Sequence, residues 1–248
     1  MKLASFDLEI AKAVEGHDWR VQRPLGISCA AVADTVDGQS VQYRMMSDDA
    51  PAMSAERCRW IVDVLRNYAD NGFTIVTVNG AGFDFSVLAE ESGMAAECAD
   101  LMLHHHCDLM MMSVCKLGWR VGLEALATSA GVKGKLHNVA LRDGRIIDNM
   151  SGAMAPQLWA EGEHEAVLAY LKDDVRATLE TAVNAVLCGH LGWYSIRGKW
   201  WQVALKYGRL PTVAECLAWP RPDTSWMSDP TDPSPIVAPA RRHSRFCR

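Results

Sequence analysis

The chain lacks a long hydrophobic run. No stretch of about 18 uncharged apolar residues is present, so the sequence predicts no transmembrane helix. Its first ten residues already include two acids, whereas a secretory signal peptide starts with a basic and then an apolar segment. We therefore expect a cytoplasmic, intracellular protein that does not bind membranes.

The cysteines lack the spacing of a metal or disulfide module. All eight are scattered, and no two follow the pattern Cys-x-x-Cys. This distribution fits reduced thiols better than a disulfide framework or a zinc module. The glycines argue against a dinucleotide-binding loop, because Gly80 and Gly82 have no third glycine at the required spacing.

A general excess of positive charge is also missing. The net charge is -5, which argues against a strongly basic nucleic-acid binder, but phosphate contacts need only a local basic patch. Trp200 and Trp201 lie between basic residues and could stack on bases, although a helical core position is the competing interpretation for at least one of them. The candidate patches are Lys133 with Lys135, Arg142 with Arg145, and Arg197, Lys199, Lys206 and Arg209.

The chain does contain enough apolar material for one sizeable core, since 49% of its 248 residues are hydrophobic. Strand-like runs come first and helical patterns follow, which predicts an α/β fold with a mixed sheet flanked by helices. The expected strands cover 2–10, 26–34, 40–46 and 73–78. The expected helices cover 54–71, 83–92, 99–116, 122–130 and 163–188.

Two segments depart from this pattern. Residues 133–154 are rich in glycine and polar residues and predict a loop-like excursion with a small hairpin. From Pro220 onward six prolines interrupt any regular pattern. We expect one domain over 1–219 and an irregular tail over 220–248 that binds nucleic acid, a partner or nothing. The basic residues at its end are Arg241, Arg242, Arg245 and Arg248.

Two acids lie in the first expected strand. Because successive strand side chains point to opposite faces, Asp7 and Glu9 point the same way. Two carboxylates on one buried face repel each other and are poorly solvated, so they need a cation or a basic partner. No Lys or Arg alternates with them, and Mg²⁺ takes oxygen ligands from carboxylates and phosphates. The alternative is an exposed edge strand whose acids lie in water.

A third acid follows the strand expected at 73–78. Asn79-Gly80-Ala81-Gly82 breaks that strand, and Asp84 falls just before or within the first turn of the next helix. An acid at this position commonly faces the helix dipole as a cap. It could also be a metal ligand at the carboxyl end of the strand.

The helix expected at 163–188 carries the remaining candidates. Tyr170 and Asp174 are four residues apart and therefore project from one face. Asp173, three residues from the tyrosine, is the rival ligand. Tyr170 could equally be a half-buried core residue with its hydroxyl in water.

Together these residues resemble the three exonuclease motifs of the DEDD superfamily. The histidine subgroup would need His at position 169, where this chain has Ala, so the resemblance is to the tyrosine subgroup, DEDDy. The spacing of its third motif favours Asp174 over Asp173. The matching motifs are Asp7-x-Glu9, Asn79 with Phe83-Asp84, and Tyr170-x-x-x-Asp174.

The likeness covers most of the chain. The stretch from Phe6 to about Leu187 resembles exonucleases related to the proofreading domain of family B DNA polymerases, and the chain is too short to include a polymerase. The excursion at 133–154 departs from that family. Further similar segments are Asp108-Leu109-Met110, Gly118 to Ala127, and Ala155 to Trp159 running into Glu165 to Val175.

The resemblance implies a ribonuclease-H-like fold, two divalent cations (Mg²⁺ or Mn²⁺) and stepwise 3'-to-5' hydrolysis of nucleic acid. Two such cations can activate water and stabilise the leaving oxygen of an in-line displacement. By the same likeness, Asp7 bridges both metals and Glu9 and Asp174 hold the metal that carries the attacking water. Asp84 binds chiefly the other metal.

The family also implies roles for neighbouring residues. Tyr170 would orient the attacking water or contact the phosphate, because a phenol with a pKa of about 10 is a poor base. The remaining residues implied are Leu8, Asn79 and Phe83 at the substrate, and Asp108 and Asp173 as supporting residues.

We expect single-stranded DNA with a free 3' end as the substrate, and a replication or repair protein is a candidate partner. An RNA-directed exonuclease and an endonuclease on the same fold are the alternatives. An inactive module that binds nucleic acid or a partner is a third, but all four acids are present.

Overall fold

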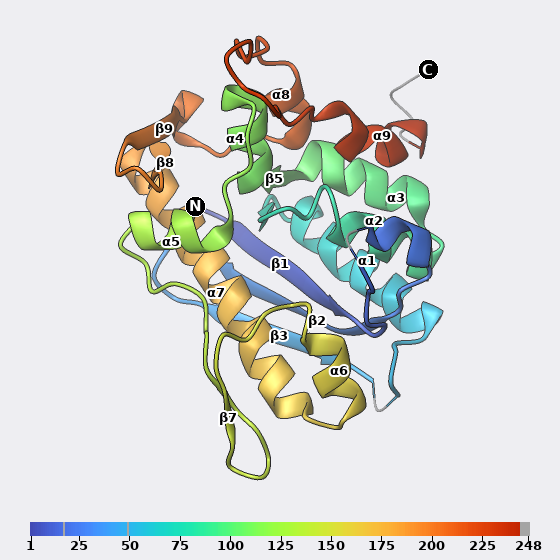
Figure 1. The fold of residues 1–248 in the computed structure, drawn as a ribbon. Coiled ribbons are helices and arrows are strands. Elements are labelled where there is room, and N and C mark those ends of the chain that lie inside the picture. Colours follow the sequence, from blue (N-terminus) through green and yellow to red (C-terminus); the bar gives the residue numbers. More distant parts are fainter. Residues whose placement is uncertain (17, 49, 244–248) are drawn as a thin grey trace.

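Strand β1 (Leu3–Ile10) lies at the centre of a mixed sheet with the order β3-β2-β1-β4-β5 (Figure 1). The computed structural model describes residues 1–16, 18–48 and 50–243. β1 is antiparallel to β2 and parallel to β4, β2 is antiparallel to β3, and β4 is parallel to β5. These directions confirm the expected ribonuclease-H-like α/β fold. The other strands are β2 (Ile27–Thr35), β3 (Gln42–Ser47), β4 (Thr74–Thr77) and β5 (His106–Asp108).

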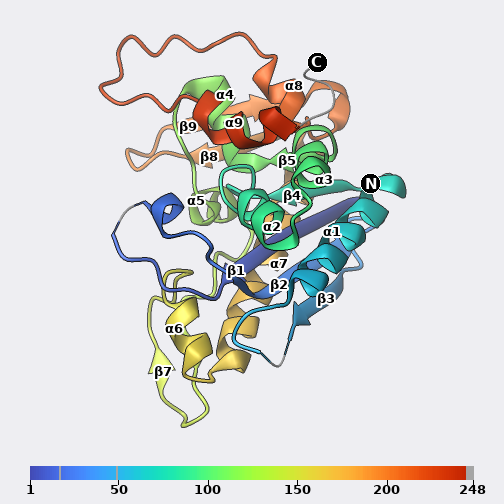
Figure 2. The same ribbon diagram turned by 90° about the vertical axis from the view of Figure 1, so that its right-hand side faces the viewer.

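Helices cover both faces of this sheet (Figures 1 and 2). α7 (His164–Cys188) packs on β1 and β2 on one face, and α1 (Ala55–Asp70) and α2 (Asp84–Ser92) pack on the other. α1 starts where Ser54 Oγ accepts the Arg57 amide, and α7 ends at Gly189, which adopts φ +74°. The remaining α-helices are α3 (Ala95–Asp100), α4 (Leu109–Leu117), α5 (Leu123–Ser129), α6 (Ala155–Ala160), α8 (Val213–Leu217) and α9 (Ser234–His243).

Alternation along β1 decides which side chains face which layer. Phe6 points toward α2, where its ring lies 6.1 Å from that of Phe85. Ser5 points the other way, and its hydroxyl lies 2.7 Å from the carbonyl oxygen of Val175 on α7. Since Asp7 and Glu9 share the parity of Ser5, they lie on the face that α7 covers.

The strands and most helices expected from the sequence are confirmed within one or two residues, but the single helix expected at 99–116 is wrong. Instead α3 runs into a π-helical segment, η2 (Leu101–His105), then β5 and α4. β5 is only three residues long and fully buried, and pairing with β4 overrides its helical surroundings. His106 lies inside it, and burial lowers the pKa of this imidazole to about 3.

The excursion and the end of the chain add elements of their own. The excursion contains the expected hairpin, β6 (Val139–Ala140) with β7 (Ile146–Ile147). A second hairpin, which the sequence did not predict, pairs β8 (His190–Tyr194) with β9 (Trp200–Ala204). Short 3₁₀ segments cover Trp19–Gln22 (η1) and Lys206–Gly208 (η3).

The tail is more ordered than its prolines suggest. Residues 220–233 form no helix or strand, but Ser234–His243 form α9, which packs on α3 with Val237 fully buried. Pro235 falls in the first turn, where a missing amide hydrogen does no harm. Arg245 and Arg248 lie outside the described residues. None of the helices in the described ranges has both the length and the apolar character that a bilayer span requires.

We expect Ser5→Ala to destabilise the protein by about 1 kcal/mol, because it removes a buried hydrogen bond between β1 and α7. In a chain of this size that corresponds to a Tm lower by about 2–4 °C in a thermal melt. The exposed Ser228→Ala should leave the Tm unchanged. Equal melting of both variants would show that the bond contributes nothing.

Candidate active site

The acids singled out in the sequence meet in one cavity at the carboxyl ends of β1 and β4. Its volume is about 600 Å³. β1, α2 and α7 supply the four acids of the motifs, so segments far apart in the chain form one site. The lining includes Asp7, Leu8, Glu9, Asn79, Phe83, Asp84, Tyr170 and Asp174. Two further candidates, Asp108 and Asp173, do not line it.

Asp7 and Glu9 reach the cavity together from β1. They pair in register with Ala31 and Cys29 of β2, whose small side chains leave room beside them. Glu9 is only 6% exposed, which excludes the edge-strand alternative. Gly152 of the excursion approaches its carboxylate closely, since a Cβ there would lie 3.5 Å from Glu9 Oε2.

Asp84 is the first residue of α2 and is 3% exposed. Its Oδ1 accepts the backbone amide of Leu8 at 3.2 Å. β4 pairs with β1 only as far as Ser5, so the Leu8 amide is left for this side chain. Leu8 thus contributes its backbone amide to the site by donating to the Asp84 carboxylate, and its contact with the substrate stays a prediction.

The loop before α2 is held by Asp108. Its two carboxylate oxygens accept the amides of Asn79 and Ala81 at 2.9 and 3.0 Å, and Oδ1 also accepts the first amides of α4. Asn79 adopts φ +74°, a left-handed conformation that asparagine tolerates. Asp108 therefore fixes the turn that presents Asp84, which is consistent with a supporting role.

Tyr170 and Asp174 project from α7 as their spacing predicts. A lysine joins them: Lys135 Nζ lies 2.7 Å from the Tyr170 hydroxyl and 2.7 Å from Asp174 Oδ2. The other oxygen, Asp174 Oδ1, is buried with no hydrogen-bond partner. Although burial alone would lower the pKa of Lys135, its contacts with Asp174 and Tyr170 raise it above the usual range, so the ammonium stays charged.

The four carboxyl groups oppose one another electrostatically. Burial, followed by the charges of the other three acids, raises the pKa of Asp7 well above its usual value. Burial and Asp174 do the same for Glu9, although Lys135 opposes the shift. Burial raises the pKa of Asp84 to about 6. Burial also raises the pKa of Asp174, although the contacts with Lys135 and Tyr170 oppose this shift.

This donor set fits divalent cations. Four hard oxygen-donor groups converge on one cavity, burial and mutual repulsion raise their pKa values, and Asp174 Oδ1 is left over as a buried acceptor. Within the described residues no three acidic, histidine or cysteine side chains already stand in ligand positions around one point, and Lys135 lies where it neutralises Asp174.

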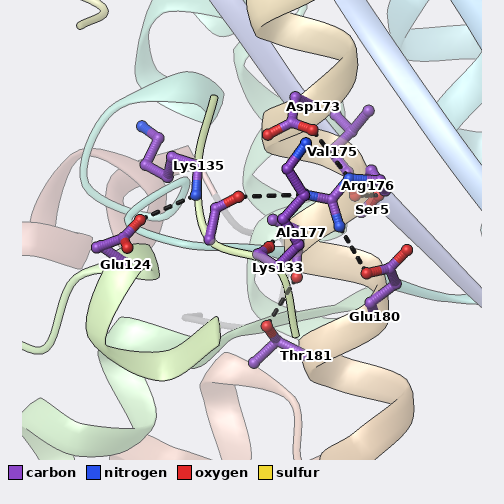
Figure 3. Close-up of polar contacts among 11 residues, drawn as sticks. Ser5, Glu124, Lys133, Lys135, Asp173, Val175, Arg176, Ala177, Glu180 and Thr181 are labelled. Atoms are coloured by element: carbon purple, nitrogen blue, oxygen red, sulfur yellow. Dashed lines mark hydrogen bonds and ion pairs between the residues drawn. The ribbon is translucent and has the colours of Figure 1, made fainter. Parts of the chain in front are cut away.

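Asp173 points elsewhere and helps to hold the lysine. It pairs with Arg176, which also pairs with Glu180 (Figure 3). The Arg176 guanidinium donates to the carbonyls of Lys133 and Gly134 at 3.0 and 3.2 Å. Glu124 of α5 accepts the next amide, that of Lys135, at 2.9 Å. α5 and α7 thus hold in place the loop that carries the Lys135 ammonium group.

Some site residues were missed by sequence reasoning or only partly recognised. Lys135 was expected as part of a basic patch, but no pattern in the neighbouring sequence predicts its contacts with Tyr170 and Asp174. Trp19 also lines the cavity, edge-on to Phe83 with ring centroids 5.0 Å apart, and nothing in its surroundings marks it. A second predicted patch is neutralised, since Arg142 pairs with Glu163 and Arg145 with Asp143.

Comparisons with known proteins find only a distant structural likeness. No protein-family model and no curated protein matches the chain. Among solved structures, E. coli exonuclease I with a 5cy-dT13 oligonucleotide is 17% identical, with a TM-score of 0.39, over 75% of this chain and 40% of that one. A moderately thermophilic exonuclease I from Methylocaldum szegediense is 13% identical, with a TM-score of 0.34, over 76% and 43%. The chain thus spans about two-fifths of these enzymes.

We expect Asp7→Asn to stabilise the metal-free protein at neutral pH by about 1 kcal/mol, or about 2–4 °C in Tm, because it removes one charge from the crowded cavity. Asp173→Asn is the matched control: it breaks the pair with Arg176 and should lower the Tm. Melts in EDTA test both. A lower Tm for both variants would contradict the proposed repulsion.

Arg176→Gln should loosen the loop that carries Lys135, because the loop carbonyls lose their donor. We expect amide hydrogen exchange over 132–136 to become about fivefold faster, the factor for about 1 kcal/mol. Arg209→Gln breaks a different ion pair, with Glu215, and should leave these amides unchanged. Unaltered exchange at 132–136 in Arg176→Gln would contradict the view that Arg176 holds this loop in place.

Proposed function

We propose that this protein is a metal-dependent 3'-to-5' exonuclease that hydrolyses single-stranded nucleic acid, DNA in preference to RNA. The observation that supports this most strongly is the convergence of Asp7, Glu9, Asp84 and Asp174 with Tyr170 in one cavity. The four acids would hold two divalent cations, Mg²⁺ or Mn²⁺. When bound, such cations activate water and stabilise the leaving oxygen in phosphodiester hydrolysis.

The chain's own groups can position the substrate. The Lys135 ammonium keeps the Tyr170 hydroxyl next to Asp174, so the phenol is poised to hydrogen bond to a phosphate oxygen or to water. Burial, then repulsion from Asp174, raises the pKa of Tyr170, and the phenol therefore orients a proton and does not act as a base.

The size and the lining of the cavity support a strand end as the substrate. Its volume of about 600 Å³ is within the range of small-ligand pockets, about 300–1,000 Å³. The edge-on pair of Trp19 and Phe83 gives one wall an aromatic surface for a base, and Asn79 adds an amide. A pocket of this size has room for the last nucleotides of one strand.

Digestion of 5'-labelled single-stranded DNA and RNA with Mg²⁺ or Mn²⁺ tests the proposal. We expect a ladder that shortens from the 3' end, more quickly on DNA, and no ladder in EDTA or with Asp84→Asn, since this variant loses a candidate ligand. Asp173→Asn, whose acid lies outside the cavity, should retain most activity.

Circular single-stranded DNA is the control for end dependence. It should survive, whereas cleavage of the circle would favour an endonuclease. No cleavage of any substrate with either metal would overturn the proposal in favour of an inactive binding module.

A further inference from the structure

The β8–β9 hairpin carries an aromatic surface outside the cavity. Its inner face packs on the core through Trp193 and Val203, each 2% exposed. On its outer face Tyr194 pairs in register with Trp200, and the two ring centroids are 4.8 Å apart. These residues are 57% and 38% exposed, so a large part of both remains open to solvent.

Trp200 is held in place by the strand opposite. A Cβ at Gly192 would lie 2.2 Å from Cζ2 of the indole, so the ring can lie over this position only because residue 192 is glycine. The indole Nε1 donates to Gln202 Oε1 at 3.2 Å. The exposed aromatic group is therefore already ordered, which lowers the entropic cost of binding to it.

The same segment is free of negative charge. No acid occurs from residue 181 to 214, although the chain has 30 acids and a net charge of -5. This stretch holds one of the basic patches expected from the sequence, and Lys199 lies 4.0 Å from the ring centroid of Trp201. Arg209 is paired with Glu215, which leaves Arg197, Lys199 and Lys206 as candidate phosphate contacts.

The hairpin is continuous with the wall of the cavity. β8 packs on α5, where the Tyr194 amide donates to Ser129 Oγ at 2.9 Å. The other end of α5, with Gly122, Leu123 and Glu124, lines the cavity. α5 is seven residues long, which is about 10 Å, so the hairpin is within reach of a strand a few nucleotides from the cavity.

We propose that the outer face of the β8–β9 hairpin binds an unpaired nucleic-acid strand by base stacking, a few nucleotides upstream of the end held in the cavity. The polarity of the strand rests on the proposed exonuclease function, but the stacking surface does not. The aromatic pair and the acid-free, basic segment 181–214 that carries it together favour a polyanion with flat bases over an apolar protein partner.

Binding without turnover tests this surface. The anisotropy of 5'-fluorescein dT16 and dT3 is measured in EDTA with the full chain. Trp200→Leu, which keeps an apolar side chain but cannot stack, should weaken dT16 binding about tenfold and leave dT3 binding unchanged. Trp200→Phe should retain most of the affinity. Tyr43→Ala, equally exposed at 38% on β3, is the matched control and should bind as the wild type does.

Charge is tested separately. Replacing Arg197 and Lys199 with Gln should reduce the salt dependence of dT16 binding by about 0.7 in log–log slope for each phosphate that the variant no longer neutralises. Wild-type affinity in Trp200→Leu, or equal losses for dT16 and dT3, would overturn the proposal. So would dimerisation that is lost in Trp200→Leu while dT16 binding persists, since the face would then be a protein interface.

The outcomes for the two proposals are distinguishable. Selective loss of dT16 binding together with no cleavage in the digestion assay would refute the exonuclease function and support the stacking surface. Normal metal-dependent digestion with unchanged dT16 binding in Trp200→Leu would refute the surface and leave the exonuclease function standing.

Discussion

Repulsion among four buried carboxyl groups is the constraint on which the rest of the structure depends. Left to themselves, Asp7, Glu9, Asp84 and Asp174 would separate or take up protons, as their raised pKa values indicate. The fold holds them through rigid surroundings: neighbouring strands around β1, a backbone amide for Asp84, and an ammonium group for Asp174. Stability is thereby traded for a cavity organised in advance, and in the proposed function its occupants are cations and phosphate.

Local periodicity is the reason much of this site was predictable from sequence. The alternation of acids in β1 and the four-residue spacing in α7 each define a face without knowledge of the fold, and both place their residues toward the same cavity. The glycine-rich break before Asp84 likewise marks the end of a strand. For Asp174 and Asp173, the ion pair with Arg176 explains why one of two adjacent acids turns away.

What could not be predicted depends on long-range contacts. Lys135 enters the cavity because α5 and α7 hold its loop, and no feature of residues 131–138 encodes that. β5 is too short to show a period of its own and exists because β4 offers it a partner. α9 forms in spite of its prolines, since burying Val237 against α3 and neighbouring groups outweighs weak helix propensity.

The contact between Ser5 and Val175 joins groups 170 residues apart in the chain. During ribosomal synthesis, at about 5–20 residues per second, β1 would emerge roughly 10 to 30 s before the helix that covers its acids. The nascent chain would therefore expose Asp7 and Glu9 before Asp174 is present to complete the cavity. The set of four acids is therefore complete only after α7 has been made.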